Sequence, residues 1–327
     1  MLTHLTGEAS RREHSTPGAE IIRSGWGAPG VVDPLRAGLP GIWLCNDQTG
    51  GLPPVVQRTL LPAGADIRTI SFDGRPVGVA YRDDAAEYAL VMGVGPEDLA
   101  AGRVRQAESV FEQLERALAD AGFAFTDTVR TWFYLDRLLE WYDDFNRVRD
   151  AFFASRGVFG GFVPASTGIG SANTTGSAIL AGAFAMRVTH PDRASKSMLP
   201  SPLQCPATDY RSSFSRAAEI AAPAGRTILV SGTASIEPGG ATAHVGDPAR
   251  QIALTMDVVE AILVSRRMDW RDTVRAVAYI KRPEDRVYWQ HWLAEHGLPG
   301  DFAQEIIADV CRDDLLFELE LDAFVRA

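Results

Sequence analysis

One tetrapeptide occurs twice in this chain of 327 residues. Asp127–Arg130 reads Asp-Thr-Val-Arg and returns as Asp272–Arg275, 145 positions later (272 − 127 = 145). The same offset carries Gln106 onto Gln251. A fixed offset of this kind predicts one structural unit written twice. Packing needs a residue in both copies, whereas a reaction needs it in only one, so polar groups present in a single copy are the first candidates for chemistry.

The composition excludes several classes of protein. With 46% hydrophobic and 23% charged residues, the chain is long enough to build two cores of ordinary size. A formal net charge of −10 and the lack of a Lys/Arg block argue against a nucleic-acid partner. No apolar run approaches the length of a membrane span, and residues 1–20 lack the apolar centre of a secretory signal. We therefore expect a cytoplasmic protein with no membrane partner.

Hydrophobic periodicity divides the chain into four parts. Residues 1–40 are rich in Gly, Pro and charge and are expected to form an irregular arm, and four prolines mark residues 189–208 as a linker without regular structure. Residues 41–188 and 209–327 form two halves, each with the predicted order strands, helix, strand, helix, strand. The predicted fold class is therefore α+β, two tandem halves in which helices cover one face of a sheet.

Two glutamates lie in the last predicted strand, residues 315–324. Strict alternation puts Glu318 and Glu320 on one face and the apolar residues between them on the other. The matching strand of the first half, residues 178–186, has no acid. A solvated sheet edge would also explain paired acids, but the asymmetry between the copies favours chemistry. A carboxyl between sheet and helices would lose hydration, so its pKa would rise and it could exchange protons near neutral pH.

Other polar residues are candidates for holding a substrate. In the segment 210–216, Tyr210 and Arg216 could bind a carboxylate through a hydroxyl and a guanidinium fork. Arg149 on the predicted second helix is a rival cation, with Arg147 beside it. An ordinary surface position is the alternative for each of these arginines.

Small residues and cysteines give weaker signals. The segments 164–170 and 231–235 could present backbone donors to an anion, although tight turns use the same residues. Cys311, seven residues before Glu318, is expected to line the same pocket as an inert, reduced thiol. The three cysteines and six histidines show no spacing typical of a disulfide framework or a metal site, and no phosphate-binding loop is present. We therefore expect neither a metal nor a cofactor.

Taken together, these motifs resemble the YjgF/RidA family, whose chorismate-mutase-like fold carries a Glu in its last strand. The resemblance covers residues 67–327 as two tandem copies. Within that superfamily the second half is similar to chorismatases and related natural-product cyclases. The similar segments are Ser231–Ile236, which reads Ser-Gly-Thr-Ala-Ser-Ile, and Cys311–Glu320, which reads Cys-Arg-x-Asp-Leu-Leu-x-Glu-x-Glu.

The resemblance implies a role for several residues. Glu318 would be the catalytic acid that protonates or deprotonates a ring substrate, and Cys311 would help to select the product. Arg216 and Tyr210 would hold a substrate carboxylate. The remaining candidates for substrate binding are Arg149, Tyr134 and Ala234. Because the superfamily places its sites between subunits, the analogy also implies a homo-oligomer.

Departures from the family patterns shape the predicted function. The Arg that YjgF-type imine deaminases use before the last strand is missing from residues 164–167 and 300–303, which disfavours imine deamination. The first half matches the chorismatase pattern only loosely. We therefore predict a cofactor-independent acid/base enzyme of aromatic secondary metabolism, such as antibiotic biosynthesis. The predicted reaction cyclises or aromatises an unstable aromatic or pre-aromatic precursor, and carbazole-type closure is one example. A chorismatase releasing pyruvate and a hydroxybenzoate-type product, and a non-catalytic small-molecule binding protein, are the alternatives.

Overall fold

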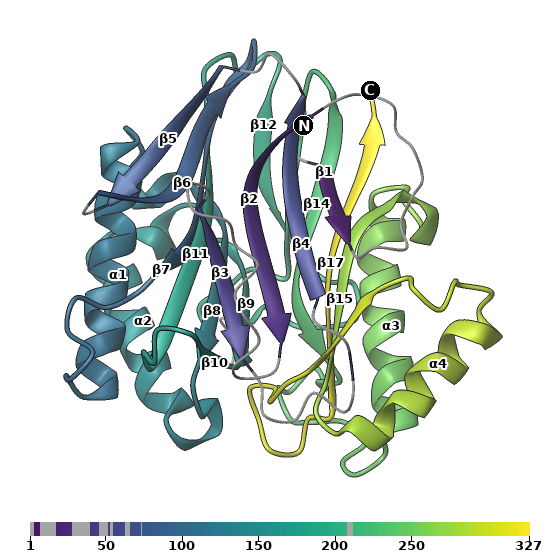
Figure 1. Ribbon diagram of the computed structural model, residues 1–327. Coiled ribbons are helices and arrows are strands. Elements are labelled where there is room, and N and C mark those ends of the chain that lie inside the picture. The colour runs from purple at the N-terminus through teal and green to yellow at the C-terminus, as the bar shows by residue number, and fades with distance from the viewer. Residues whose placement is uncertain are drawn as a thin grey trace.

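Three β-sheets enclose a common interior, and helices cover the outside of two of them (Figure 1). The computed structural model describes residues 3–6, 18–27, 40–45, 52, 55–62, 66–72, 74–207 and 212–327. Apolar side chains from all three sheets meet in one buried cluster, to which Trp26, Leu90 and Leu229 each contribute from a different sheet. This shared interior is what joins the parts of the chain.

Two of the sheets have the same strand order. Across the first-half sheet the strands are β5 (Ile67–Phe72), β6 (Arg75–Arg82), β7 (Ala86–Val94), β11 (Ile179–Val188), β8 (Thr128–Leu135) and β9 (Ala165–Gly170). Across the second-half sheet they are β12 (Ser195–Leu199), β13 (Ala217–Ala222), β14 (Gly225–Ala234), β17 (Phe317–Arg326), β15 (Thr273–Ile280) and β16 (Gln304–Ile307). In both sheets the last pair is parallel and the others are antiparallel.

Helices pack on the outer face of each of these sheets. They are α1 (Arg103–Asp120), α2 (Tyr142–Ser155), α3 (Pro248–Ser265) and α4 (Arg286–Glu295). Short 3₁₀ turns adjoin them: η1 (Phe125–Asp127), η2 (Leu138–Glu140), η3 (Val158–Gly160), η5 (Trp270–Asp272) and η6 (Pro283–Asp285). On the first half Phe111 packs against Phe133 and Phe145, and on the second Trp289 packs against Phe317. Burying one such ring contributes about 1.5–3 kcal/mol, so each helix layer is held mainly by its apolar face.

The repeated residues lie in matching elements and make matching hydrogen bonds in both halves. The bounds of α1 and α3 differ by the predicted offset at both ends (248 − 103 and 265 − 120, each 145), as do those of β8 and β15. Gln106 Oε1 accepts a hydrogen bond from the backbone N–H of Ala178 at 2.8 Å, and Gln251 Oε1 accepts one from Leu316 at 2.8 Å. Each glutamine thus ties its helix to the start of the central strand. The prediction of two tandem α+β halves is confirmed.

A third sheet corrects the prediction for the N-terminal residues. Its strands are β1 (Thr3–Thr6), β4 (Val55–Pro62), β2 (Gly18–Gly27), β3 (Gly41–Cys45) and β10 (Ala172–Asn173). The prediction of an irregular arm over residues 1–40 is therefore wrong where β1 and β2 form, because pairing with β4 outweighs a composition unfavourable to strands. The rest of that arm lies largely outside the described residues.

The proline-rich linker also contains regular structure. Strand β12 (Ser195–Leu199) lies within residues 189–208 and pairs with β13, so the expectation of no regular structure is wrong there. Pro191 and Pro200 flank this strand without entering it, and β12 is the edge of its sheet, where proline is best tolerated. The boundaries of the two halves stay a prediction.

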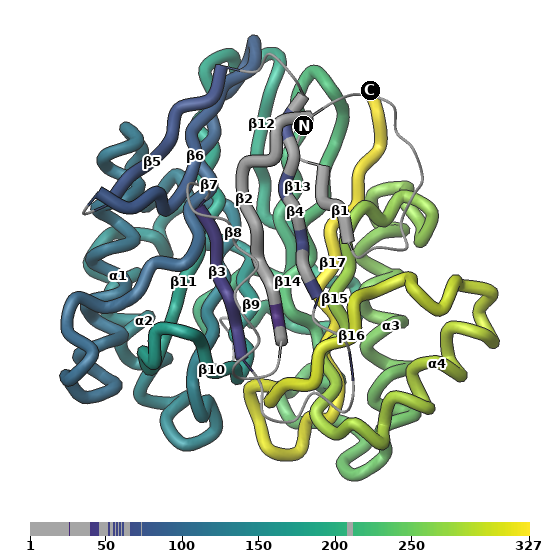
Figure 2. Tube along the Cα trace, viewed as in Figure 1, coloured from purple at the N-terminus to yellow at the C-terminus, as the bar shows by residue number. Residues whose placement is uncertain are grey.

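Strand β17 connects the two ends of the interior. It lies between β14 and β15 and runs from the bottom of the view to the C-terminus at the top (Figure 2). The two acids singled out in the sequence lie near its beginning. Among the described residues, no helix is long and apolar enough to cross a membrane.

Candidate functional site

Glu318 lies in the middle of a sheet and faces the interior. It is opposite Ala234 on β14 and Tyr279 on β15, and only 4% of its surface is exposed. The alternating residues Phe317 and Leu319 pack into the core formed with α3 and α4. The two acids therefore share a face, as predicted, and a solvated sheet edge is excluded. The expected place between sheet and helices is wrong, because the acids face away from the helices.

A bulge in the neighbouring strand makes room for the Glu318 carboxyl. The register of β14 against β17 shifts between Val230 and Thr233, and Gly232 lies within that shift. A Cβ at Gly232 would stand 1.9 Å from Glu318 Oε1 and 2.8 Å from its Cδ, closer than any real contact. The site therefore requires the absence of a side chain at Gly232.

The same bulge lies where the two halves meet. Ser166 on β9 donates its N–H to Ser231 Oγ at 2.9 Å, and Gly232 donates its N–H to Thr167 Oγ1 at 3.1 Å. The two small-residue segments of the sequence are thus side by side, but these backbone donors join the halves to each other. Glu318 is placed at a junction between copies of one unit.

Glu320 is held in a ring of cations and donors. Its carboxylate lies 3.0 Å from Arg130 Nη2 and 2.5 Å from Arg275 Nη1, and it accepts hydrogen bonds from Trp132 Nε1 at 2.7 Å and from the Tyr279 hydroxyl at 3.2 Å. Burial alone would raise the pKa of Glu320, but the two guanidinium groups outweigh it and lower that pKa to about 2. Glu320 is therefore a fixed anion.

Glu318 has the opposite protonation behaviour. Burial and the nearby negative charge of Glu320 raise the pKa of Glu318 to about 8, although Arg130 opposes this rise. No hydrogen-bond partner of its carboxyl is found within the described part of the chain. Two carboxyl groups with pKa values pushed apart by their surroundings are typical of acid/base sites, in which one group moves protons and the other keeps its charge.

Two predicted residues lie beside Glu318. Cys311 packs in a small apolar cluster with Ala234 and Leu315, and burial together with the charge of Glu318 raises the pKa of its thiol to about 12. The Cys311 thiol is therefore neutral at pH 7, and its place in the wall of a substrate pocket stays a prediction. The structure brings Glu318, Cys311 and Ala234 together.

Arg149 approaches the same place from the first half. It lies on α2, is 2% exposed, and its charge acts on the Cys311 thiol. Its Nη2 donates to Asn146 Oδ1 at 2.8 Å, while its buried Nε has no hydrogen-bond partner. Within the described residues no carboxylate lies within 4 Å of this guanidinium. Arg149 is thus a buried cation available to an anionic ligand.

The remaining predicted residues differ in their surroundings, and their roles stay predictions. Arg216 is buried and donates from Nε to the Cys205 carbonyl at 3.0 Å, and its own carbonyl accepts from the N–H of Ser231. Tyr134 is buried next to the charge of Glu320, and burial is the main cause of its raised pKa. Arg147 forms a surface ion pair with Asp144. Tyr210 lies outside the described residues.

Arg130 and Arg275, the cationic partners of Glu320, were not predicted from the sequence. Arg130 donates to the Val230 carbonyl at 2.7 Å and to Thr167 Oγ1 at 2.7 Å, besides its ion pair with Glu320. One signal was available, since Arg130 and Arg275 are the last residues of the repeated tetrapeptide. A buried acid pair in the last strand would have been a reason to look for these cations.

Comparisons with known proteins identify the fold of the chain. A crystal structure of a chorismatase superposes with a TM-score of 0.73, covers 99% of this chain and 98% of that chain, and is 19% identical in sequence. The chain has the chorismatase fold. A 3-hydroxybenzoate synthase from Streptomyces hygroscopicus is 28% identical over 280 residues, which is 76% of each chain. The predicted resemblance to chorismatases is therefore confirmed.

Other comparisons cover less of the chain. Rv2704 from Mycobacterium tuberculosis, of the YjgF/YER057c/UK114 family, covers 40% of this chain and 100% of its own, with a TM-score of 0.32 and 21% identity. No protein-family model matches the chain. With the similarity to the synthase, the prediction of an enzyme of aromatic metabolism with a small-molecule substrate is confirmed at that general level.

Proposed function

We propose that this chorismatase-fold protein converts chorismate into pyruvate and a hydroxybenzoate-type product, with Glu318 as its proton donor and acceptor. The observation that carries the proposal is the buried pair of acids with opposite pKa shifts, about 8 for Glu318 and about 2 for Glu320. The similarity to a 3-hydroxybenzoate synthase supports this reaction over the others that the sequence left open.

The chemistry needs a group that first gives and then takes a proton. Chorismate carries an enol ether of pyruvate on a cyclohexadiene ring. Protonated Glu318 gives its proton to the terminal methylene carbon of the enol ether, the ring C–O bond breaks, and its electron pair leaves with the oxygen of pyruvate. The ring cation then loses a proton to the Glu318 carboxylate and becomes aromatic. Atoms and charge balance without water, and the acid is regenerated.

The surroundings of Glu318 suit these two steps. At pH 7 a group with a pKa near 8 is mostly protonated, yet it lies close enough to neutrality to accept a proton back. The fixed negative charge of Glu320 favours the protonated form of Glu318 and stabilises a cationic ring nearby. The neutral Cys311 thiol, which is not a ready nucleophile, would restrict where the ring can lie and so influence the product.

Arg149 is the residue that we assign to a substrate carboxylate. Its guanidinium is buried, its charge acts on the Cys311 thiol, and its Nε has no hydrogen-bond partner within the described residues. A buried cation of this kind is stabilised when an anionic ligand arrives. Arg130 is less suitable, because Glu320 already neutralises it.

The test is a turnover assay with chorismate. The wild-type chain should release pyruvate together with an aromatic acid, both identified by mass spectrometry, and Glu318→Gln should lose both by about 10²–10⁴-fold. Glu295→Gln is the matched control, since Glu295 is exposed and pairs with His291 at the surface. Wild-type activity in Glu318→Gln would refute the role of this residue, and a wild-type chain that leaves chorismate intact would refute the substrate.

The other predictions from the sequence are tested by the same assay. If chorismate is bound but not consumed, the non-catalytic alternative is favoured. If it is neither bound nor consumed, cyclisation of another ring precursor, including a carbazole-type closure, is favoured. The homo-oligomer and the cytoplasmic location stay predictions.

A further inference from the structure

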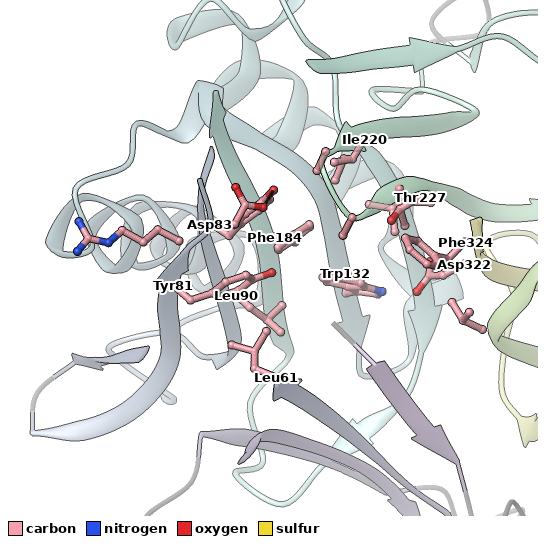
Figure 3. Close-up of a pocket in the computed structure, with 17 residues that line it drawn as sticks. Leu61, Tyr81, Asp83, Leu90, Trp132, Phe184, Ile220, Thr227, Asp322 and Phe324 are labelled. Carbon is pink, nitrogen blue, oxygen red and sulfur yellow. Dashed lines mark hydrogen bonds between the residues drawn. The ribbon is translucent and has the colours of Figure 1, made fainter. Parts of the chain in front are cut away.

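A cavity of about 240 Å³ lies at the other end of the interior from Glu318. All three sheets contribute to its wall, and Figure 3 shows the side chains that point into it. Its more exposed members, Arg82 and Ala224, place its mouth at the surface. Its apolar and aromatic lining includes Tyr81, Tyr88, Trp132, Phe184, Ile220 and Leu229.

This cavity is separate from the Glu318 site. On β17 its lining residues are Asp322 and Phe324, four and six residues beyond Glu318. At about 3.3 Å per residue of a strand, that places them roughly 13 and 20 Å away along the sheet. The ion pairs of Glu320 with Arg130 and Arg275 lie between the two places.

The wall of the cavity suits an aromatic ring. Tyr81 stacks on Tyr88 with ring centroids 4.9 Å apart, and Tyr88 is parallel to Phe184 at 6.0 Å, so the first-half sheet presents a row of rings. Ile220 lies on the other side of the cavity in Figure 3, and Leu229 also lines the cavity. A cavity of 150 Å³ with an apolar wall suffices to bind benzene in another protein, so about 240 Å³ accommodates a ring with substituents.

The charges around the cavity select against an anion. Two lining residues are acids: Asp83, which accepts the Tyr88 hydroxyl at 2.9 Å, and Asp322, which lies 3.3 Å from Arg275. The lining cation Arg82 is exposed, as is Asp83, and it pairs with Asp66 at 3.3 Å, whereas Asp322 is buried. A carboxylate ligand would therefore lose hydration next to two acids, whereas a hydroxyl or amino group could donate to one of them.

We infer that this cavity is a second ligand site, for a single-ring aromatic molecule that is uncharged and carries a hydroxyl or amino substituent. The ligand would lie against Trp132, whose indole N–H donates to Glu320 at 2.7 Å. A ligand in the cavity would therefore contact a hydrogen-bond donor of Glu320, which with Arg130 and Arg275 forms the charge cluster that borders the Glu318 site. The inference does not depend on the reaction proposed above.

Binding of phenol, measured by isothermal titration calorimetry on the full chain, tests the site. Phenol should bind with one site per chain, and benzoate should bind at least about tenfold more weakly. Leu229→Trp and Ile220→Trp each add a ring to the cavity and should weaken phenol binding by about tenfold or more, and thermal unfolding checks that each variant is folded. If one variant is unfolded, the other decides.

A comparison between the two sites separates this inference from the proposed function. Glu318→Gln should bind phenol like the wild type, even where turnover of chorismate is lost or was never present. Phenol binding that is lost in Glu318→Gln, or that survives both tryptophan variants, would place the ligand elsewhere and overturn the inference. Equal affinity for benzoate would overturn the assigned ligand class.

Discussion

Replacing Glu318 by glutamine should stabilise the protein at neutral pH while removing its proposed reactivity. Burial and Glu320 raise the pKa of Glu318 from 4.5 to about 8 in the folded chain. Below pH 4.5 the group is protonated in both the folded and the unfolded chain, so it has no effect on pH-dependent stability. Between these two values the unfolded chain releases the proton and the folded chain keeps it, so the free energy of unfolding falls as the pH rises.

The size of this effect follows from the pKa values. From pH 4.5 to pH 7, an interval of about 2.5 pH units, the folded chain keeps a proton that the unfolded chain has released. At 1.36 kcal/mol per unit, this lowers the free energy of unfolding at pH 7 by about 3 kcal/mol. At pH 5 the same calculation leaves less than about 1 kcal/mol. Glutamine has nearly the same shape and no charge to bury, so Glu318→Gln should remove the penalty. The variant should therefore be more stable than the wild type by about 3 kcal/mol at pH 7 and nearly equal to it at pH 5.

Urea unfolding of both proteins at pH 5 and pH 7 measures the difference. The matched control is Glu295→Gln at the surface, which should change the free energy of unfolding by less than about 0.5 kcal/mol at either pH. A Glu318→Gln chain that is less stable than the wild type at pH 7 would show that the ionised carboxylate is favoured in the fold. A gain of the same size at both pH values would show that packing, and not the proton, is responsible. Either result would refute the reasoning.

Four further predictions concern the same site. Glu320→Gln should lower the free energy of unfolding by about 3 kcal/mol at pH 7, because the shift of the Glu320 pKa from 4.5 to about 2 stabilises the fold above pH 4.5. This stabilisation is lost as the pH falls through about 2. Urea unfolding measures the difference, and an unchanged midpoint would contradict it. Gly232→Ala should force the Glu318 carboxyl to move and lower kcat/KM with chorismate by about 10²-fold, with Gly239→Ala, where a Cβ meets no atom within 4 Å, as the control. The kcat/KM of the wild type should fall as the pH rises through about 8, since the proton donor is then lost, and a flat profile from pH 6 to 9 would exclude Glu318 as the acid. Cys311→Ala should keep pyruvate release but change the ratio of aromatic products in the mass spectrum, and an identical ratio would contradict its role in product selection.

The sequence predicted most of the structure that depends on local periodicity. The offset of 145 residues found in the sequence also separates α1 from α3 and β8 from β15 at both ends. The N-terminal strands were missed because they depend on pairing with β4, which lies more than 25 residues away in the sequence. Backbone pairing between distant segments leaves little trace in composition, and here the Gly and Pro content of residues 1–40 indicated an irregular segment and not strands.

The candidate site was predictable only in part for the same reason. Glu318 was found because it occurs in one copy, and Cys311 because it lies near Glu318 in sequence. Arg149 was one of several candidate cations, but only the structure shows that it is buried and that its charge acts on the Cys311 thiol of the other half. The role of Gly232 could not be read from the sequence, because it depends on a register shift between β14 and β17.

The duplication explains why the charge cluster bridges the two halves. In the second half Arg275 pairs with the acids of its own sheet, Glu320 and Asp322. In the first half the positions opposite Trp132 and Arg130 on β11 are Gly182 and Phe184, which match the two acids by register. Arg130 therefore finds no acid opposite it on β11, and its guanidinium instead pairs with Glu320 and donates to the Val230 carbonyl of the second half.

This exchange of partners has a chemical consequence. Arg130 and Arg275 both pair with Glu320 and keep that carboxylate charged, and its charge adds to burial in holding the proton on Glu318. With an acid at position 182, Arg130 would have a partner in its own sheet, and the charge on Glu320 would depend on Arg275 alone. The absence of acids from β11 thus leaves Arg130 to pair with Glu320, and this ion pair is one of the contacts that link the two halves.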